Sequence, residues 1–85
     1  MFYHNTFVEV SGDTPADIVQ QLYEDSRRGI GPDLTKQEWW EYQRTVWRRM
    51  ERKTLPATPD DKGAAERFLQ IVVEVGALEE GPKPG

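Results

Sequence analysis

The hydrophobic and polar positions of the chain predict one strand followed by three helices. The strand is Phe2–Val10, where aromatic and β-branched residues predominate and the turn-forming residues Ser11-Gly12-Asp13 follow. Because a single strand is not stable alone, its partner is either a second short segment of the chain or a second copy of it. In the second case the protein would be a homodimer joined through Phe2–Val10.

A first amphipathic helix is predicted from Thr14 to Gly29. Thr14 is a capping residue, Pro15 suits the first helical position, and the helix dipole favours the carboxylate of Asp17 in the first turn. The apolar residues that follow fall within an arc of about 140°, namely Ile18, Val19, Leu22 and Tyr23. One face of this helix should therefore lie on a hydrophobic core.

A second helix is predicted from Thr35 to about Lys53, because the four residues that begin at Thr35 and end at Glu38 match a capping box. Its apolar residues on one narrow stripe should face the core, and they are Trp39, Tyr42, Val46 and Met50. On a neighbouring side the helical period brings together Trp40 and Trp47. A basic ridge on the far side consists of Arg44, Arg48 and Arg52.

A third helix, from Gly63 to Val75, follows a proline-rich connection in which one further short strand around Leu55 is an open alternative. The β-branched run Ile71–Val75 also fits a strand. We favour the helix because the segment starts with good helix formers and Gly76 follows it. The fold class is therefore α+β, with a single compact domain at residues 1–78 and a disordered C-terminal tail at residues 79–85.

The same patterns predict which side chains form the core. These are Phe7, Ile18, Val19, Leu22, Trp39, Val46, Met50, Phe68, Leu69 and Val72. Three Trp and three Tyr in 85 residues help to make such a core sufficient for a small domain.

Composition limits where the protein works. The chain contains no cysteine, so disulfides, thiolate metal sites and cysteine nucleophiles are excluded. We also find no apolar run long enough for a membrane span and no signal-peptide pattern at the start. The expected location is the cytoplasm, with no membrane partner.

The sequence offers little for catalysis. The single histidine, His4, lies on the predicted strand, where a structural role is much commoner than a catalytic one. Neither Ser11 nor Ser26 sits in a nucleophile elbow, and Asp60-Asp61 is better explained as helix-start chemistry than as a cation site. We therefore predict a protein that is not an enzyme and that needs no cofactor or metal.

The charge is unevenly distributed along the chain. Residues 36–53 include six basic and three acidic residues, a net charge of +3, whereas the remainder carries −7. A basic helix with aromatic residues is one way to bind nucleic acid, and Arg44, Arg48 and Arg52 would contact the phosphates. The acidic remainder opposes a polyanion, so this function is the alternative and not the leading hypothesis.

The two tryptophans beside the predicted core stripe suggest a docking surface for another protein. The guanidinium of Arg44 is placed to pack across both rings. Because Trp and Arg dominate interface hot spots, the predicted partner-binding residues are Trp40, Arg44, Trp47, Arg48 and Glu51. The competing interpretation is that both rings pack beneath a neighbouring helix.

Three segments in this order resemble small bacteriophage and prophage proteins of uncharacterised activity. They are Thr14–Val19 with Glu24-Asp25-Ser26, the Trp- and Arg-rich stretch Trp40–Arg52, and Ala65–Leu69 with Gly76-Ala77-Leu78. The resemblance brings no activity with it. It implies a mobile-element origin, in the cytoplasm of a bacterial host, and a non-catalytic protein that acts by protein–protein interaction. An inhibitor of a host or defence complex and a virion accessory are two versions of that function.

Overall fold

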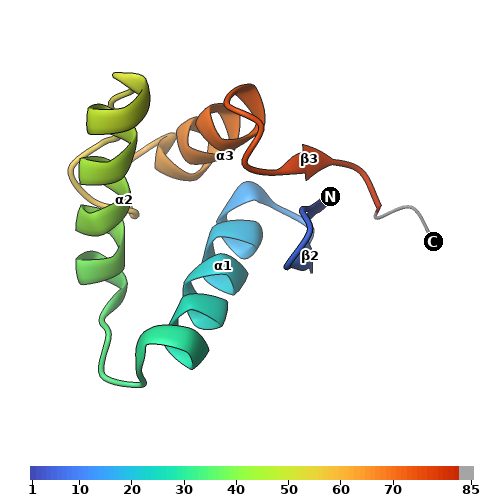
Figure 1. Cartoon of the computed structure of the whole chain (residues 1–85), viewed down its shortest axis with the longest axis horizontal. Coiled ribbons are helices and arrows are strands. Elements are labelled where there is room, and N and C mark those ends of the chain that lie inside the picture. The colour runs from blue at the N-terminus through green and yellow to red at the C-terminus, as the bar shows by residue number, and fades with distance from the viewer. Residues whose placement is uncertain (83–85) are drawn as a thin grey trace.

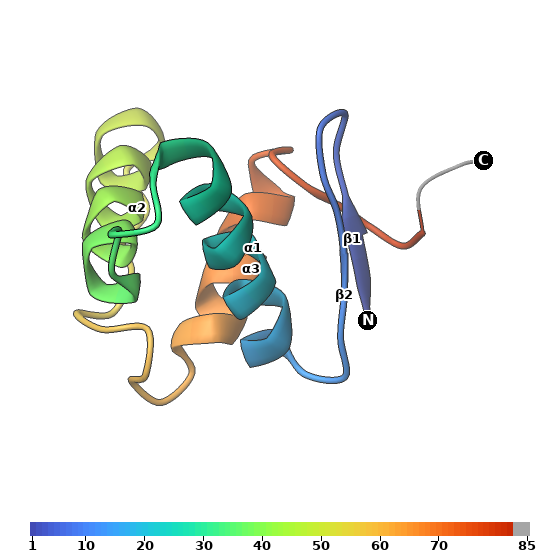
Figure 2. The ribbon, with the colours of Figure 1, turned by 90° about the horizontal axis from the view of Figure 1, so that it is seen from below.

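The computed structural model describes residues 1–82 as three layers (Figures 1 and 2). One outer layer is helix α2, the middle layer holds α1 and α3, and the other outer layer is a small sheet. The helices are α1 (Pro15–Ile30), α2 (Lys36–Glu51) and α3 (Ala64–Glu74). The strands are β1 (Phe2–His4), β2 (Glu9–Ser11) and β3 (Glu79–Glu80), and their antiparallel order in the sheet is β2-β1-β3. The predicted α+β class is therefore confirmed.

The predicted single strand Phe2–Val10 is a hairpin of two short strands, β1 and β2. The side chain of Asn5 forms the turn, because its Oδ1 accepts hydrogen bonds from the backbone N–H of Phe7 at 2.7 Å and of Val8 at 2.8 Å. This turn puts Phe7 at the tip of the hairpin, where its side chain is 94% exposed. Its assignment to the core is therefore wrong.

The sheet is completed by β3, which lies in the segment predicted to be a disordered tail. Glu80 pairs with Tyr3 and Glu79 pairs with His4, so the prediction for residues 79–85 is wrong at these two positions. Its last residues, 83–85, lie outside the described part of the chain. Because β1 has a neighbour on each side, the premise that the N-terminal strand lacks a partner within the chain is also wrong.

The outer edge of β2 is occupied by a side chain from α1. The amide of Gln21 donates to the carbonyl oxygen of Ser11, and its Oε1 accepts from the Ser11 N–H at 3.3 Å. Backbone groups at a free edge are what recruits another strand. This contact therefore removes part of the edge through which a homodimer at Phe2–Val10 would form.

Local sequence signals predict the starts of α1 and α2 correctly. Both helices begin with a reciprocal capping box, Thr14 with Asp17 and Thr35 with Glu38. The end of α1 lies slightly beyond the predicted Gly29, because the N–H of Gly31 still donates to the carbonyl of Arg27 at 2.9 Å.

The third helix is confirmed, and the alternative strand at Ile71–Val75 is wrong. Its Phe68 ring lies 5.6 Å from each of the rings of Trp39 and Trp40, which ties α3 to α2. Within the described residues Leu55 belongs to no strand, but its side chain is buried against the same core. The other predicted core residues that are buried are Ile18, Val19, Leu69 and Val72.

Candidate functional site

The surface of α2 is the candidate functional site, because the sequence places there both the unusual charge and the unusual aromatics. The helix buries only two of its 16 residues, Trp39 and Trp40. The side of α2 that faces the body is therefore the side of both rings, and not the stripe that starts at Trp39 and continues through Val46. Because a different side of α2 faces the body from the one predicted, most residues predicted on the helix have a different role.

Trp40 is a core residue and so cannot form part of a surface patch. Its side chain is fully buried, and its Nε1–H donates to the carbonyl oxygen of Pro56 at 2.8 Å. Trp47 is half-buried against the core, with its Nε1–H donated to Oε1 of Gln43 at 3.0 Å. The competing interpretation of the two rings is therefore correct for Trp40, and the Trp47 indole keeps the partial exposure that the prediction required.

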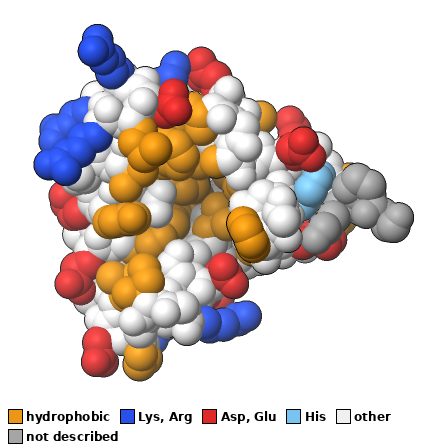
Figure 3. Space-filling view, in the orientation of Figure 1, with side chains coloured by type: hydrophobic (Ala, Val, Ile, Leu, Met, Phe, Trp, Pro, Cys, Tyr) orange, Lys and Arg blue, Asp and Glu red, His pale blue; other side chains and the backbone are white. Residues whose placement is uncertain are grey.

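Two members of the predicted stripe are exposed instead of buried. Tyr42 is 62% exposed and Met50 is 72% exposed, while Val46 is half-buried. The assignment of Met50 to the core is wrong, because Met50 lies in the last turn of α2, beyond Trp39 and Trp40, which attach the helix to the body. Figure 3 shows apolar side chains gathered over the region between α2 and α1, with basic side chains over the upper part of α2.

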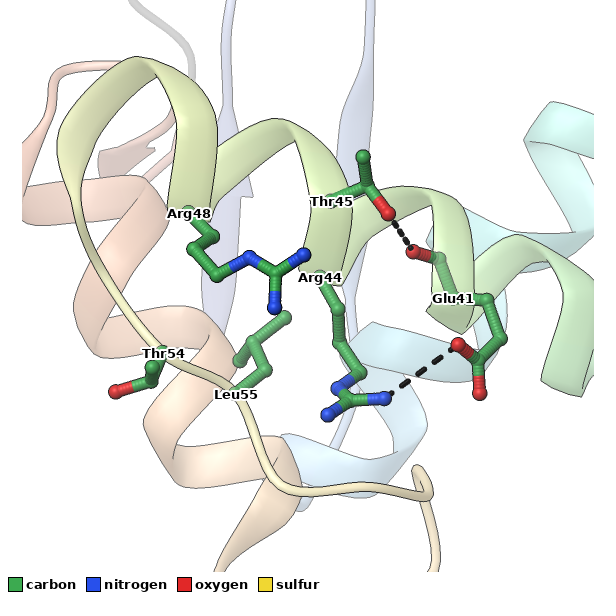
Figure 4. Close-up of a pocket in the computed structure, with 6 residues that line it drawn as sticks. All are labelled: Glu41, Arg44, Thr45, Arg48, Thr54 and Leu55. Atoms are coloured by element: carbon green, nitrogen blue, oxygen red, sulfur yellow. Dashed lines mark hydrogen bonds and ion pairs between the residues drawn. The ribbon is translucent and has the colours of Figure 1, made fainter.

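Of the three arginines predicted as a ridge, only two lie together. Arg44 and Arg48 extend into one small cleft of about 100 Å³ between α2 and the segment that holds Thr54 and Leu55 (Figure 4). Arg52 has left the helix, because it is the C-terminal cap with a left-handed backbone at φ 55°. The cleft therefore brings together two of the three guanidinium groups.

The Arg44 guanidinium bonds to Glu41 and shows no cation–π contact with tryptophan among residues 1–82. Its Nη1 lies 3.4 Å from Oε2 of Glu41, at the long end of an ion pair between partly exposed groups. Arg48 has no carboxylate partner in the same part of the chain. An incoming carboxylate or phosphate would find a pair of guanidinium donors here, which is the chemistry best suited to charge-assisted hydrogen bonds.

The remaining predicted partner-binding residue, Glu51, is exposed at the end of α2. Sequence reasoning missed Tyr42, Met50 and their basic neighbour Arg49 as surface residues. For Met50 the helical period gives no signal, since it places Met50 in the arc between the buried Trp39 and Trp40. The sequence alone does not say which of the two sides faces inward.

Two other ionisable groups, His4 and Glu38, have structural roles. His4 is buried between two acceptors, with Nδ1 2.8 Å from the carbonyl oxygen of Gly81 and Nε2 2.9 Å from Oε2 of Glu79. Both ring nitrogens are thus committed to the junction of β1 and β3. Hydrogen bonding with the side chain and the backbone of Thr35 lowers the pKa of Glu38. In this capping box the Thr35 N–H donates to Oε1 of Glu38, and Oγ1 of Thr35 accepts from the Glu38 N–H, both at 3.1 Å.

Residues 1–82 contain no group of three or more His, Cys, Asp or Glu side chains placed to hold a metal ion. None of the helices in this part of the chain is long and apolar enough to span a bilayer.

Comparison with known proteins adds no further assignment: no family model, no curated protein and no solved structure matches this chain.

Proposed function

We propose that this chain is a non-catalytic protein-binding domain and that the outward side of α2 is its docking surface. The observation that carries the proposal is the exposure of Tyr42 and Met50 on a helix whose Arg48 and Arg49 have no carboxylate partner among residues 1–82. Large apolar side chains at such exposure gain free energy when a partner covers them, at about 25 cal/mol per Å² of apolar surface. Tyr and Arg are also frequent hot-spot residues.

The arrangement of α2 describes the partner that would fit it. Tyr42 and Met50 call for an apolar surface, and Arg49, next to Tyr42 on the helix surface, calls for a carboxylate beside it. A protein surface that is apolar at its centre and acidic at its edge has both features. In the phage-type setting implied by the sequence resemblance, the partner would be a host or defence complex, or a component of the virion.

Nucleic-acid binding remains the alternative function, supported by the anion-binding chemistry of the Arg44 and Arg48 cleft. Two features count against it. Arg52 does not continue the row of guanidinium groups, and the remainder of the chain carries a net charge of −7. At a screening length of about 10 Å in 0.1 M salt, those acidic groups still repel a polyanion that lies along α2.

The test is affinity capture from host lysate with three forms of the protein, before and after nuclease treatment. Wild type should retain a partner that Met50→Glu loses, because a carboxylate would then be buried in the interface. Phe7→Glu is the matched control, since it places the same charge on a fully exposed apolar position away from α2. Loss of the partner upon nuclease treatment would favour nucleic acid, and equal capture by all three forms would contradict the proposed surface.

A further inference from the structure

The molecule has a second unusual surface, a groove of about 450 Å³ between α3 and the sheet. Tyr3, Leu69 and Val73 line its apolar part. It is larger than the cleft on α2 and of the size that small ligands or a few side chains occupy in other proteins. Tyr3 and Leu69 are buried in its floor and Val73 is half-buried, so the groove is a concave apolar seat for a side chain from outside.

The rim of the groove is acidic. Glu66, Glu74 and Glu80 are exposed and line it, and within residues 1–82 only Glu74 has a cation partner, Lys53 at 2.9 Å. Burial and the charge of Glu80 both raise the pKa of Tyr3, which reports the negative environment at the sheet side of the groove. A basic group beside an apolar side chain is therefore the complementary ligand.

The outward side of α2 has that complementary chemistry. Tyr42 and Met50 are exposed apolar side chains, and Arg49 projects from the same helix without a carboxylate partner in the described residues. The groove lies between α3 and the sheet, whereas α2 is the outer layer on the other side of α3 (Figures 1 and 2). One copy therefore cannot bring its own α2 surface onto its own groove.

We propose that a second copy of this chain occupies the groove, with the Tyr42, Arg49 and Met50 side of α2 docked against Leu69 and Val73 and Arg49 near the acidic rim. This assignment rests on the proposed function of α2 and adds a second copy of the chain to the partners that its docking surface binds. Because the two surfaces differ, the contact is head-to-tail, and repetition of it produces a ring or an open chain of copies. The apolar contacts hold the copies together, and the charges orient them.

The experiment is sedimentation velocity of the full chain from low-micromolar to near-millimolar concentration. The mean sedimentation coefficient of wild type should rise with concentration, and added salt should reduce that rise. Arg49→Glu blocks the α2 surface and Glu66→Arg blocks the groove, so each variant alone should stay monomeric. Controls with the same charge changes elsewhere, Arg28→Glu and Glu24→Arg on the exposed part of α1, should associate like wild type.

Mixing the two blocked variants in equal amounts gives the decisive result. Each pair then has one intact α2 surface opposite one intact groove, and in the other contact both charges are reversed and again attract, so the mixture should sediment faster than either variant alone. A mixture that stays monomeric, or a wild type that is monomeric throughout, would overturn the proposal. In either event a lysate partner that still depends on Met50 would leave the proposed function of α2 in place.

Discussion

Helices α2 and α3 meet at one aromatic cluster, yet they differ in how much of each is buried. In the 11 residues of α3, six side chains are buried, whereas the 16 residues of α2 bury only two. The buried residues of α3 are Ala64, Ala65, Phe68, Leu69, Ile71 and Val72. Both buried residues of α2, Trp39 and Trp40, contact the same Phe68.

This difference separates the helix that stabilises the fold from the helix for which we propose a role in binding. Helix α3 contributes to folding along most of its length, since its side chains meet α1, the aromatic rings of α2 and the groove beside the sheet. Helix α2 is attached through its N-terminal half, and the rest of its surface carries arginine and exposed apolar side chains. Substitutions on the two helices should therefore have very different effects.

The largest expected effect is on α3. Phe68→Ala removes a ring that is 3% exposed and that contacts both buried tryptophans, so it should lower the free energy of unfolding by about 3–5 kcal/mol. Met50→Ala, on the outward side of α2, should change it by less than about 0.5 kcal/mol. Urea unfolding followed by circular dichroism measures both values. Equal losses in the two variants would mean that the helices do not differ as described.

A smaller effect is expected where α2 itself is anchored. Trp40→Phe keeps an aromatic ring but removes the donor to the carbonyl oxygen of Pro56, and an unsatisfied buried acceptor costs about 1–3 kcal/mol. Trp47→Phe is the comparison, because its Nε1–H bonds to Gln43 on a half-exposed surface. In thermal unfolding, the melting temperature of Trp40→Phe should be lower than that of Trp47→Phe. The opposite order would mean that Trp47 attaches α2 to the body.

The smallest expected effect concerns the ion pair between Glu74, at the end of α3, and Lys53, which follows α2. We expect this pair to make the stability of the fold sensitive to acid. The Lys53 ammonium lowers the pKa of Glu74 by its hydrogen bond and its charge. A carboxyl whose pKa is lower in the folded state stabilises the fold above its unfolded pKa, and loses that contribution as the pH falls through the folded pKa. Glu74→Gln should therefore flatten the fall in melting temperature on acidification slightly, whereas Glu66→Gln should leave this part of the profile unchanged.

Local chemistry explains which parts of this fold are predictable from sequence. The starts of α1 and α2 depend on residues within one helical turn, such as Thr14 and Asp17 or Thr35 and Glu38, and those signals are complete in the sequence. The apolar arc of α3 is wide enough that any packing would bury most of it. The helix is therefore the better prediction there, although a β-branched run follows Phe68.

The candidate site could be predicted only in part, because the rotation of α2 depends on the tertiary structure. Its apolar residues continue to the last turn, and the body covers Trp39 and Trp40 but not Met50. Likewise, β3 is a pair of glutamates that joins the sheet through its backbone, and no side-chain pattern at Glu79 and Glu80 indicates a strand. The bend at Asn5 depends on one side chain in an otherwise strand-like run.

The pairing of β3 with β1 also has a consequence for the order of folding. It joins His4 to Glu79, near opposite ends of the chain, whereas the helices are built from contacts close in sequence. Contacts at long sequence separation form slowly, because the loop between them must first close. We therefore expect the three helices to assemble first and the two chain ends to join last, so that early species on the pathway leave Tyr3 and the groove uncovered.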